Sequence, residues 1–259
     1  MTQRLKYLLR VPEAADNKYT RGVLGFVTGS EAFPGAALLG VQAAARTSVG
    51  MIRYVGPAVV EQLVIEARPE VVLGFAKVDA WVLGSGVDPA EELQVANIHL
   101  AAAQGAPCII DAGAMFVISY DQLLPLSCIL TPHAGELARL LDDFGMHLEL
   151  DYESVQAAAR ITQQIVILKG NTSLIAHPNG EVVAVGPNSP ALSTAGTGDV
   201  LAGILGALIA ANPGADLVEV AQLGVLLHSE AASRAAALGP VVAMDVVDNL
   251  RTVVLDWSA

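Results

Sequence analysis

Basic residues are scarce in this chain of 259 residues, which has 14 lysines and arginines against 26 acidic residues and a formal net charge of −12 at pH 7. Proteins that bind nucleic acid present a basic surface to the phosphate backbone. The charge balance therefore argues against nucleic acid as a partner. It leaves room for a small anionic ligand, which needs only local backbone amides and one or two cations.

Cysteines and long apolar runs are also few. Cys108 and Cys128 lie in apolar segments and form no CxxC motif, so we expect two buried, reduced core residues. The charged N-terminal segment 1–22 has no apolar signal core, and no run approaches the roughly 20 apolar residues of a membrane span. We therefore expect a cytoplasmic protein without a membrane partner.

Several familiar catalytic motifs are absent from the sequence. No Gly-Lys pair forms a Walker A loop, and Gly84-Ser85-Gly86 and Gly196-Thr197-Gly198 both lack the third glycine of a dinucleotide fingerprint. No HExxH motif or close His/Cys cluster indicates a transition-metal site, and we expect no metal ligands of that kind. No GxSxG motif indicates an acyl-transfer serine.

What the chain has in abundance is apolar residues, which make up 53% of the sequence. They form short, nearly all-apolar segments that alternate with helical ones, as is typical of a mostly parallel sheet covered on both faces. Because no linker or repeat interrupts this pattern, we expect one α/β domain over residues 1–259. The expected strands are 22–28, 51–55, 80–83, 107–110, 127–130 and 165–168, followed by a hairpin of 173–176 and 181–185.

Helices are expected between and after these strands. Asp88-Pro89 supplies an N-cap followed by proline at the first helical position, so a helix should run from there to about Gln104. The other expected helices are 35–49, 59–67, 135–144, 152–164, 200–211, 217–237 and 246–255.

Polar and glycine residues gather where the expected parallel strands end. In sheets of this kind, ligands bind beyond the carboxyl ends of the strands. The sequence therefore predicts a ligand site at this edge of the sheet. The residues are Gly29-Ser30, Gly84-Ser85-Gly86, Asp111, Thr131-Pro132-His133 and Lys169-Gly170.

The stretch 193–203, STAGTGDVLAG, combines a small-residue loop, one carboxylate at Asp199 and the start of an uncharged helix. The first turn of a helix has free N–H groups and partial positive charge, and small residues let an anion reach them. An acid in that turn can act as a base beside a bound phosphate. The alternative is a glycine turn in which Asp199 caps the helix. With Lys169 and His133 at strand ends, the residues fit phosphoryl transfer to a hydroxyl.

Three segments carry a resemblance to a known family. Residues 131–141, TPHAGELARLL, resemble the TPHxGExxRLL segment of ADP/ATP-dependent NAD(P)H-hydrate dehydratases, which belong to the ribokinase-like superfamily. Residues 166–170, VILKG, are similar to the family's VVLKG, and 194–203 are similar to its TGGTGDVLAG. The resemblance extends in order over about residues 18–237.

The resemblance implies a ribokinase-like three-layer sandwich and a role in nicotinamide nucleotide repair. Such an enzyme is a carbon–oxygen lyase that dehydrates the S-epimer of hydrated NADH or NADPH. ADP or ATP phosphorylates the C6 hydroxyl, and phosphate then leaves. Mg²⁺ bridging the donor phosphates is expected, as are a cytoplasmic location and a homo-oligomer, a tetramer by resemblance. Within these 259 residues we expect no epimerase domain of the kind that some members carry.

The same resemblance assigns roles to individual residues. Asp199 would be the base, with the amides of Gly196, Thr197 and Gly198 as the anion hole. The adenine nucleotide would be bound by Lys169, Gly170, Asn171, Thr172 and Ser173, together with Gly198, and the hydrated dinucleotide by Ala36, Ala37, Gly86, His133 and Asp199.

Some positions depart from the family pattern and leave alternatives open. Thr172 stands where KGxGT has its second glycine, and Gly113 replaces the second acid of DADAL. One alternative function is a kinase of a small alcohol such as a vitamin precursor, and another is a non-catalytic nucleotide-binding protein. At the residue level, His133 could be a loop histidine bonded to backbone, Lys169 a structural ion pair, Asp111 a turn residue and His228 a core residue.

Overall fold

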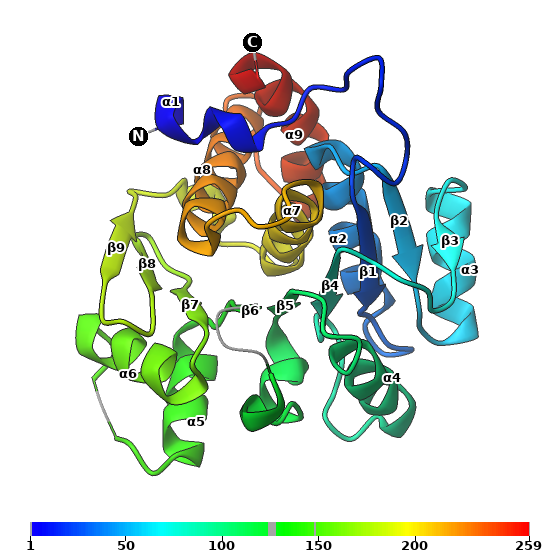
Figure 1. The fold of residues 1–259 in the computed structure, drawn as a ribbon. Coiled ribbons are helices and arrows are strands. Elements are labelled where there is room, and N and C mark those ends of the chain that lie inside the picture. The colour runs from blue at the N-terminus through cyan, green and yellow to red at the C-terminus, as the bar shows by residue number, and fades with distance from the viewer. Residues whose placement is uncertain (1, 124–127, 148, 259) are drawn as a thin grey trace.

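Over residues 2–123, 128–147 and 149–258, which the computed structural model describes, the strands form one nine-stranded sheet (Figure 1). Its order is β3-β2-β1-β4-β5-β6-β7-β8-β9. Neighbours from β3 to β7 are parallel, and the β7–β8 and β8–β9 pairs are antiparallel. The strands are β1 (Val23–Val27), β2 (Met51–Tyr54), β3 (Val72–Leu73), β4 (Ala80–Leu83), β5 (Cys108–Ile110), β6 (Cys128–Leu130), β7 (Ile165–Leu168), β8 (Ser173–Ala176) and β9 (Val182–Val185).

The mostly parallel sheet and its closing hairpin confirm the expected α/β class, and every expected strand is present. Ser127, the first residue expected in the 127–130 strand, lies outside the described residues. Strand β3 was not expected, because its two residues are too short a segment to show a period. It forms the edge of the sheet beside β2.

Helices cover both faces of the sheet, with α2, α7, α8 and α9 on one side and α4, α5 and α6 on the other (Figure 1). The bounds are α1 (Thr2–Leu5), α2 (Pro34–Thr47), α3 (Ala58–Ala67), α4 (Glu92–Ala102), α5 (Ala134–Asp143), α6 (Tyr152–Thr162), α7 (Thr197–Ala211), α8 (Leu217–Ala236) and α9 (Ala243–Ser258). Short 3-10 turns are η1 (Lys6–Leu8), η2 (Ala112–Phe116), η3 (Tyr120–Gln122) and η4 (Pro190–Leu192).

The two covered faces explain why the strands are apolar throughout. Side chains alternate across a strand, so Leu24 and Phe26 of β1 pack in one core while Val23 and Val27 pack in the other. Cys108 and Cys128 are paired residues on β5 and β6, and both are buried and outside any disulfide, as expected.

The start of α4 differs from the prediction. The helix begins at Glu92, not at Pro89. The Asp88 carboxylate instead accepts the backbone N–H of Ala90 at 2.8 Å, and the N–H of Glu91 bonds to the Asp88 carbonyl at 2.9 Å. Asp88 therefore closes a local turn, a use of aspartate that competes with helix capping.

Helix α7 crosses α2 at close range. A Cβ added at Gly203 would lie 2.2 Å from the Gly40 carbonyl oxygen, so this crossing requires glycine. A Cβ at Gly40 would lie 3.4 Å from the backbone oxygen of Asp199. The crossing thus fixes the first turn of α7 against α2.

In the part of the chain that the structure describes, we find no helix with the length and apolar character to cross a lipid bilayer.

Candidate active site

The ends of four neighbouring strands meet at Asp111, which follows β5 and is 3% exposed. One carboxylate oxygen accepts the Thr131 hydroxyl at 2.7 Å and the Lys169 ammonium at 3.1 Å. The other accepts the Ser85 hydroxyl at 2.8 Å. These residues follow β4, β6 and β7, so the predicted convergence of strand-end residues is present around one buried carboxylate.

Asp111 and Lys169 form a buried ion pair. Burial alone would raise the pKa of Asp111, but Lys169 and the hydroxyls of Thr131 and Ser85 outweigh it and hold that pKa below the ordinary value. Burial would likewise lower the pKa of Lys169, yet Asp111 and Glu136 raise it. Both groups are therefore charged at neutral pH.

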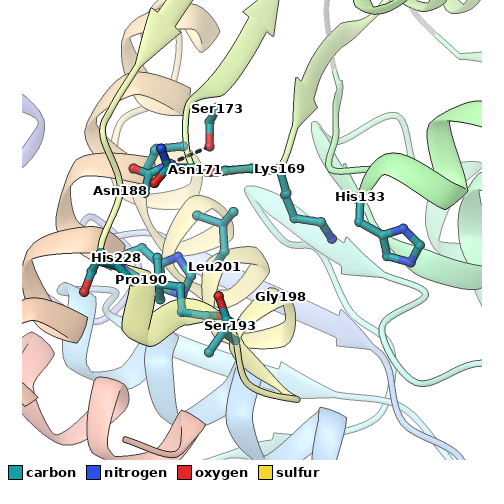
Figure 2. Close-up of a pocket in the computed structure, with 15 residues that line it drawn as sticks. His133, Lys169, Asn171, Ser173, Asn188, Pro190, Ser193, Gly198, Leu201 and His228 are labelled. Atoms are coloured by element: carbon teal, nitrogen blue, oxygen red, sulfur yellow. Dashed lines mark hydrogen bonds between the residues drawn. The ribbon is translucent and has the colours of Figure 1, made fainter. Parts of the chain in front are cut away.

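The Lys169 side chain forms a structural ion pair with Asp111 and also reaches the first turn of α7. Its ammonium lies 3.8 Å from a Glu136 oxygen, and a Cβ added at Gly198 would be 3.4 Å from it. Figure 2 shows the side chain extending from the end of β7 toward the space between His133 and Gly198. A cation thus stands beside the first turn of α7.

The loop before α7 depends on glycine at its N-cap. Gly196 has φ +89°, and a Cβ there would lie 2.5 Å from a Leu39 methyl group. The Thr197 hydroxyl shares its one proton between the carbonyls of Leu192 and Thr194, at 2.9 and 3.0 Å, which holds the loop closed. Because the N-cap has no side chain, the first amides of α7 receive no side-chain cap.

Asp199 lies in that first turn and is partly exposed. Over the described residues, its carboxylate accepts no hydrogen bond, so it does not act as the helix cap that was the alternative. Burial, followed by the negative charges of Asp111 and Glu136, raises the pKa of Asp199 to about 7, while Lys169 opposes the rise. A carboxyl with a pKa near neutrality is suited to accept a proton at physiological pH.

A cavity of about 460 Å³ opens beside Lys169 and Gly198 (Figure 2). Five of the residues expected to bind nucleotide line it, whereas Thr172 does not. Asp199 is not in its wall but directly follows Gly198, which is. The lining expected residues are Lys169, Gly170, Asn171, Ser173 and Gly198.

The residues expected to contact the dinucleotide lie in two places. Gly86 meets α2, since a Cβ at that position would lie 2.5 Å from the Ala36 methyl group. Ala36 is 9% exposed, and Ala37 is fully buried in the core. His133 instead lies at the start of α5 and lines the main cavity.

His133 is held by a reciprocal capping interaction. Its Nδ1 accepts the backbone N–H of Glu136 at 3.2 Å, and its own backbone N–H donates to the Glu136 carboxylate at 2.7 Å. His133 is therefore bonded to backbone and also lines the cavity, so the two alternatives for this residue do not exclude each other.

Two cavity residues had no clear signal in the sequence. Asn188 donates to the Gly170 carbonyl at 2.9 Å and the Ser173 hydroxyl at 3.0 Å, which closes the loop after β7. His228 of α8 is buried, as expected of a core residue, but it also lines the cavity. Burial and then Lys169 lower the pKa of His228 to about 3, so its imidazole is neutral. Only the fold brings either side chain to this wall.

The sequence model of the NAD(P)H-hydrate dehydratase family matches residues 24–252. This chain belongs to that family. The ribokinase-like fold implied by the resemblance is confirmed as well, since solved members superpose on nearly the whole chain.

Three comparisons place the chain among dehydratases. It is 33% identical over 259 residues to the bifunctional NAD(P)H-hydrate repair enzyme of Mycobacterium leprae, covering 93% of this chain and 53% of that protein. It is 32% identical over 247 residues to the ADP-dependent (S)-NAD(P)H-hydrate dehydratase of Neisseria meningitidis, covering 88% and 82%. The ADP/ATP-dependent NAD(P)H-hydrate dehydratase of Bacillus subtilis, co-crystallised with ATP and Mg²⁺, is 26% identical with a TM-score of 0.85, covering 99% and 97%.

The bifunctional relatives are longer than this chain, which spans about half of their length.

Proposed function

We propose that this protein is a nucleotide-dependent dehydratase that converts the S-epimer of hydrated NADH or NADPH back to the reduced dinucleotide. The observation that carries the proposal is the partly exposed carboxyl of Asp199, with a pKa of about 7, beside Lys169 and the uncapped amides of α7. That arrangement lies in a chain matching the dehydratase family over residues 24–252.

In the proposed first step, Asp199 takes the proton of the C6 hydroxyl of the hydrated ring. The oxygen then attacks the terminal phosphorus of ADP or ATP, and the bond to the bridging oxygen breaks. AMP or ADP leaves with that bond's electron pair. Lys169 and the amides of Gly196, Thr197 and Gly198 stabilise the charge on the transferred group.

In the second step, the ring nitrogen supplies electrons as the C6–oxygen bond breaks and phosphate leaves. A proton then leaves the adjacent ring carbon, which restores the double bond of the reduced nicotinamide. Phosphorylation makes this step possible because hydroxide is a poor leaving group and phosphate a good one. The net reaction removes one water and consumes one phosphoanhydride bond.

In this proposal the nucleotide binds in the cavity of about 460 Å³, and the lining by Lys169, Gly170, Asn171 and Ser173 supports that position. Thr172, which stands where the family has glycine, does not line that cavity, and its hydroxyl would lie 3.2 Å from a Cβ added at Gly186. The departure from KGxGT therefore leaves the cavity open.

Mg²⁺ bound to the donor phosphates fits the acidic residues at this edge. Over the described residues, no three metal-ligating side chains cluster, so the ion would depend on the phosphates and water, as Mg²⁺ commonly does. Both oxygens of Asp111 already accept hydrogen bonds. One Glu136 oxygen accepts the His133 backbone N–H at 2.7 Å, and the other lies 3.6 Å from Nε2 of the His133 ring. The Glu136 carboxylate would hold the ion, which would supply positive charge to the migrating phosphoryl group.

Incubation with hydrated NADH and either ADP or ATP tests the proposal. We expect loss of the hydrate and recovery of the absorbance of reduced nicotinamide, with one phosphate released per turnover. A phosphorylated product that accumulates without dehydration would instead indicate a kinase of a small alcohol. Nucleotide binding without any turnover would indicate a non-catalytic protein.

We further propose that residues 1–259 act as one dehydratase domain in a cytoplasmic homo-oligomer, such as a tetramer. Exposed large apolar side chains, among them Tyr7, Val11 and Leu255, support self-association. Light scattering of the purified protein measures its mass in solution, and a monomer would contradict this part of the proposal.

A further inference from the structure

A second cavity, of about 310 Å³, adjoins the first at His133, which lines both. Its other walls come from the segment after β4, from η2 and from α5. The nucleotide residues that follow β7 are not part of it. Its lining residues include Val87, Gly113, Phe116, Glu136 and Arg139.

Arg139 is the cation of this second cavity. Its guanidinium lies 3.9 Å from the centre of the Phe116 ring, and the side chain is exposed. No carboxylate of the described residues lies within ion-pair distance of it, although the chain has 26 acidic residues. Stacking fixes the plane of the guanidinium and leaves its edge free to bind an anion through two parallel hydrogen bonds.

Glu136 also lines the second cavity, but its carboxylate interacts with His133 and Lys169. Its carboxylate accepts the His133 backbone N–H at 2.7 Å and lies 3.8 Å from the Lys169 ammonium. Its side chain is 15% exposed, in contrast to that of Arg139. The charge that the cavity presents to solvent is therefore positive.

The second cavity lies within reach of the reacting groups. Glu136 and Arg139 are three residues apart on α5, so they are neighbours on one face of the helix, about 4.5 Å apart along its axis. Glu136 in turn lies beside Lys169, and Lys169 beside Gly198 and Asp199. Val87 of the second cavity directly follows Gly86, which meets α2 at Ala36.

We propose that Arg139, stacked on Phe116, binds a phosphate group of the hydrated dinucleotide in this second cavity while the nicotinamide ring lies at Asp199. The inference rests on the proposed function and extends it to the non-reacting half of the substrate. The donor nucleotide occupies the main cavity, so the rest of the dinucleotide needs a separate site with positive charge. The group bound is the pyrophosphate or, in NADPH hydrate, the 2′-phosphate.

Steady-state kinetics of Arg139→Ala with both hydrates test this assignment. We expect KM for the hydrated dinucleotide to rise at least tenfold, with kcat and the KM for ADP nearly unchanged, because the contact is equal in the ground and transition states. Arg139→Lys keeps the charge but loses the flat fork, and should recover only part of the loss. Arg251→Ala, which removes an exposed arginine of α9 on the other side of the sheet, is the matched control.

The two hydrates identify the phosphate. An equal rise in KM for NADH and NADPH hydrate indicates the pyrophosphate, and a rise confined to NADPH hydrate indicates the 2′-phosphate. An unchanged KM for both overturns the inference, as does a rise that appears only in the KM for ADP.

Direct titration with NADPH, followed by its fluorescence, separates this inference from the proposed function. If the unaltered protein turns over neither hydrate, the proposed function fails, yet Arg139→Ala should still weaken NADPH binding at least tenfold. Equal binding by the unaltered protein and Arg139→Ala overturns the inference, and so does an unaltered protein that does not bind NADPH.

Discussion

At the scale of single residues, the proposed chemistry depends on the carboxyl of Asp199, whose environment is set by three charged neighbours. Burial, Asp111 and Glu136 raise the pKa of Asp199 to about 7 from an ordinary value of 3.8, against the opposing effect of Lys169. The pKa of Asp111 is lowered instead, because the charge of Lys169 and the hydrogen bonds from Thr131, Ser85 and Lys169 outweigh the effect of burial. Two acids at one edge of the sheet are thus tuned in opposite directions, one to stay charged and one to accept a proton.

Asp199→Asn removes the proposed base while keeping the size of the side chain. We expect turnover of hydrated NADH to fall by about 100-fold or more, the usual range for a general base, because the hydroxyl then keeps its proton. Isothermal titration should still detect nucleotide binding, since the main cavity is lined by other residues. Unchanged turnover would contradict the role of Asp199.

The pH profile follows from the same raised pKa. The proposed base works only when ionised, so kcat/KM should level off above about pH 7 and fall about tenfold per pH unit below it. The sign for stability is opposite, because the folded state binds the extra proton. The contribution of Asp199 to stability is therefore present below pH 3.8 and declines as pH rises through about 7. An activity limb near pH 4 would show that the carboxyl is not perturbed.

Asp111→Asn tests the buried ion pair. Lys169 would lose its closest anionic partner, and we expect the free energy of unfolding to drop by about 2 kcal/mol, together with a higher KM for the nucleotide. Urea unfolding measures the first effect. Asp142→Asn, at an exposed carboxylate paired with His147, is the control and should change stability little.

At the scale of elements, the site is positioned by the crossing of α2 and α7. The two helices pack without side chains between Gly40 and Gly203. Each helix brings residues expected at the site, Ala36 and Ala37 on α2 and Asp199 on α7. The relative placement of these residues therefore follows from backbone packing, not from any bond between them.

Gly203→Ala should separate the two helices. The new methyl group would lie 2.2 Å from the Gly40 carbonyl oxygen, so we expect a loss of about 1–3 kcal/mol in unfolding free energy. Activity should fall as well, because the first turn of α7 moves. Gly35→Ala is the matched control on α2, where a Cβ has no neighbour within 4 Å and should be neutral or slightly stabilising. Equal stability of the two variants would mean that the crossing is not tight.

At the scale of the whole molecule, the main cavity lies between the β7–β9 end of the sheet and helices α7 and α8. Its walls come from the segment after β7, the loop after β9, α7 and α8. A ligand there contacts segments far apart in the sequence. Its binding free energy should therefore add to the stability of the fold as a whole.

Saturating nucleotide should raise the melting temperature. With ATP and Mg²⁺ at about 100 times Kd, the expected stabilisation is about 2.7 kcal/mol, or on the order of 5–10 °C for a protein of this size. Differential scanning fluorimetry measures the shift, with CTP as the comparison nucleotide. No shift at any ATP concentration would contradict a nucleotide site in this cavity.

The sequence by itself determined the elements and much of the site's composition. Strands buried on both faces must be apolar along their whole length, so 80–83, 165–168 and 173–176 were predicted with the bounds found for β4, β7 and β8. The small-residue loop before Asp199 was predicted from its glycine and alanine content, and Gly196 in that loop has a φ of +89°, a conformation that favours glycine. The prediction was wrong at Asp88, which was expected to cap a helix but closes a turn, because aspartate is favoured in both places.

Tertiary structure alone decided which of these residues act together. Asp111 and Lys169 are separated by 58 positions, and no local pattern shows that their charges meet. The pKa of Asp199 and the place of His228 in the cavity wall likewise depend on burial and on charges from other elements. Backbone conformation is set largely by neighbours in the chain, whereas desolvation and Coulomb forces act through space and exist only once the chain has folded.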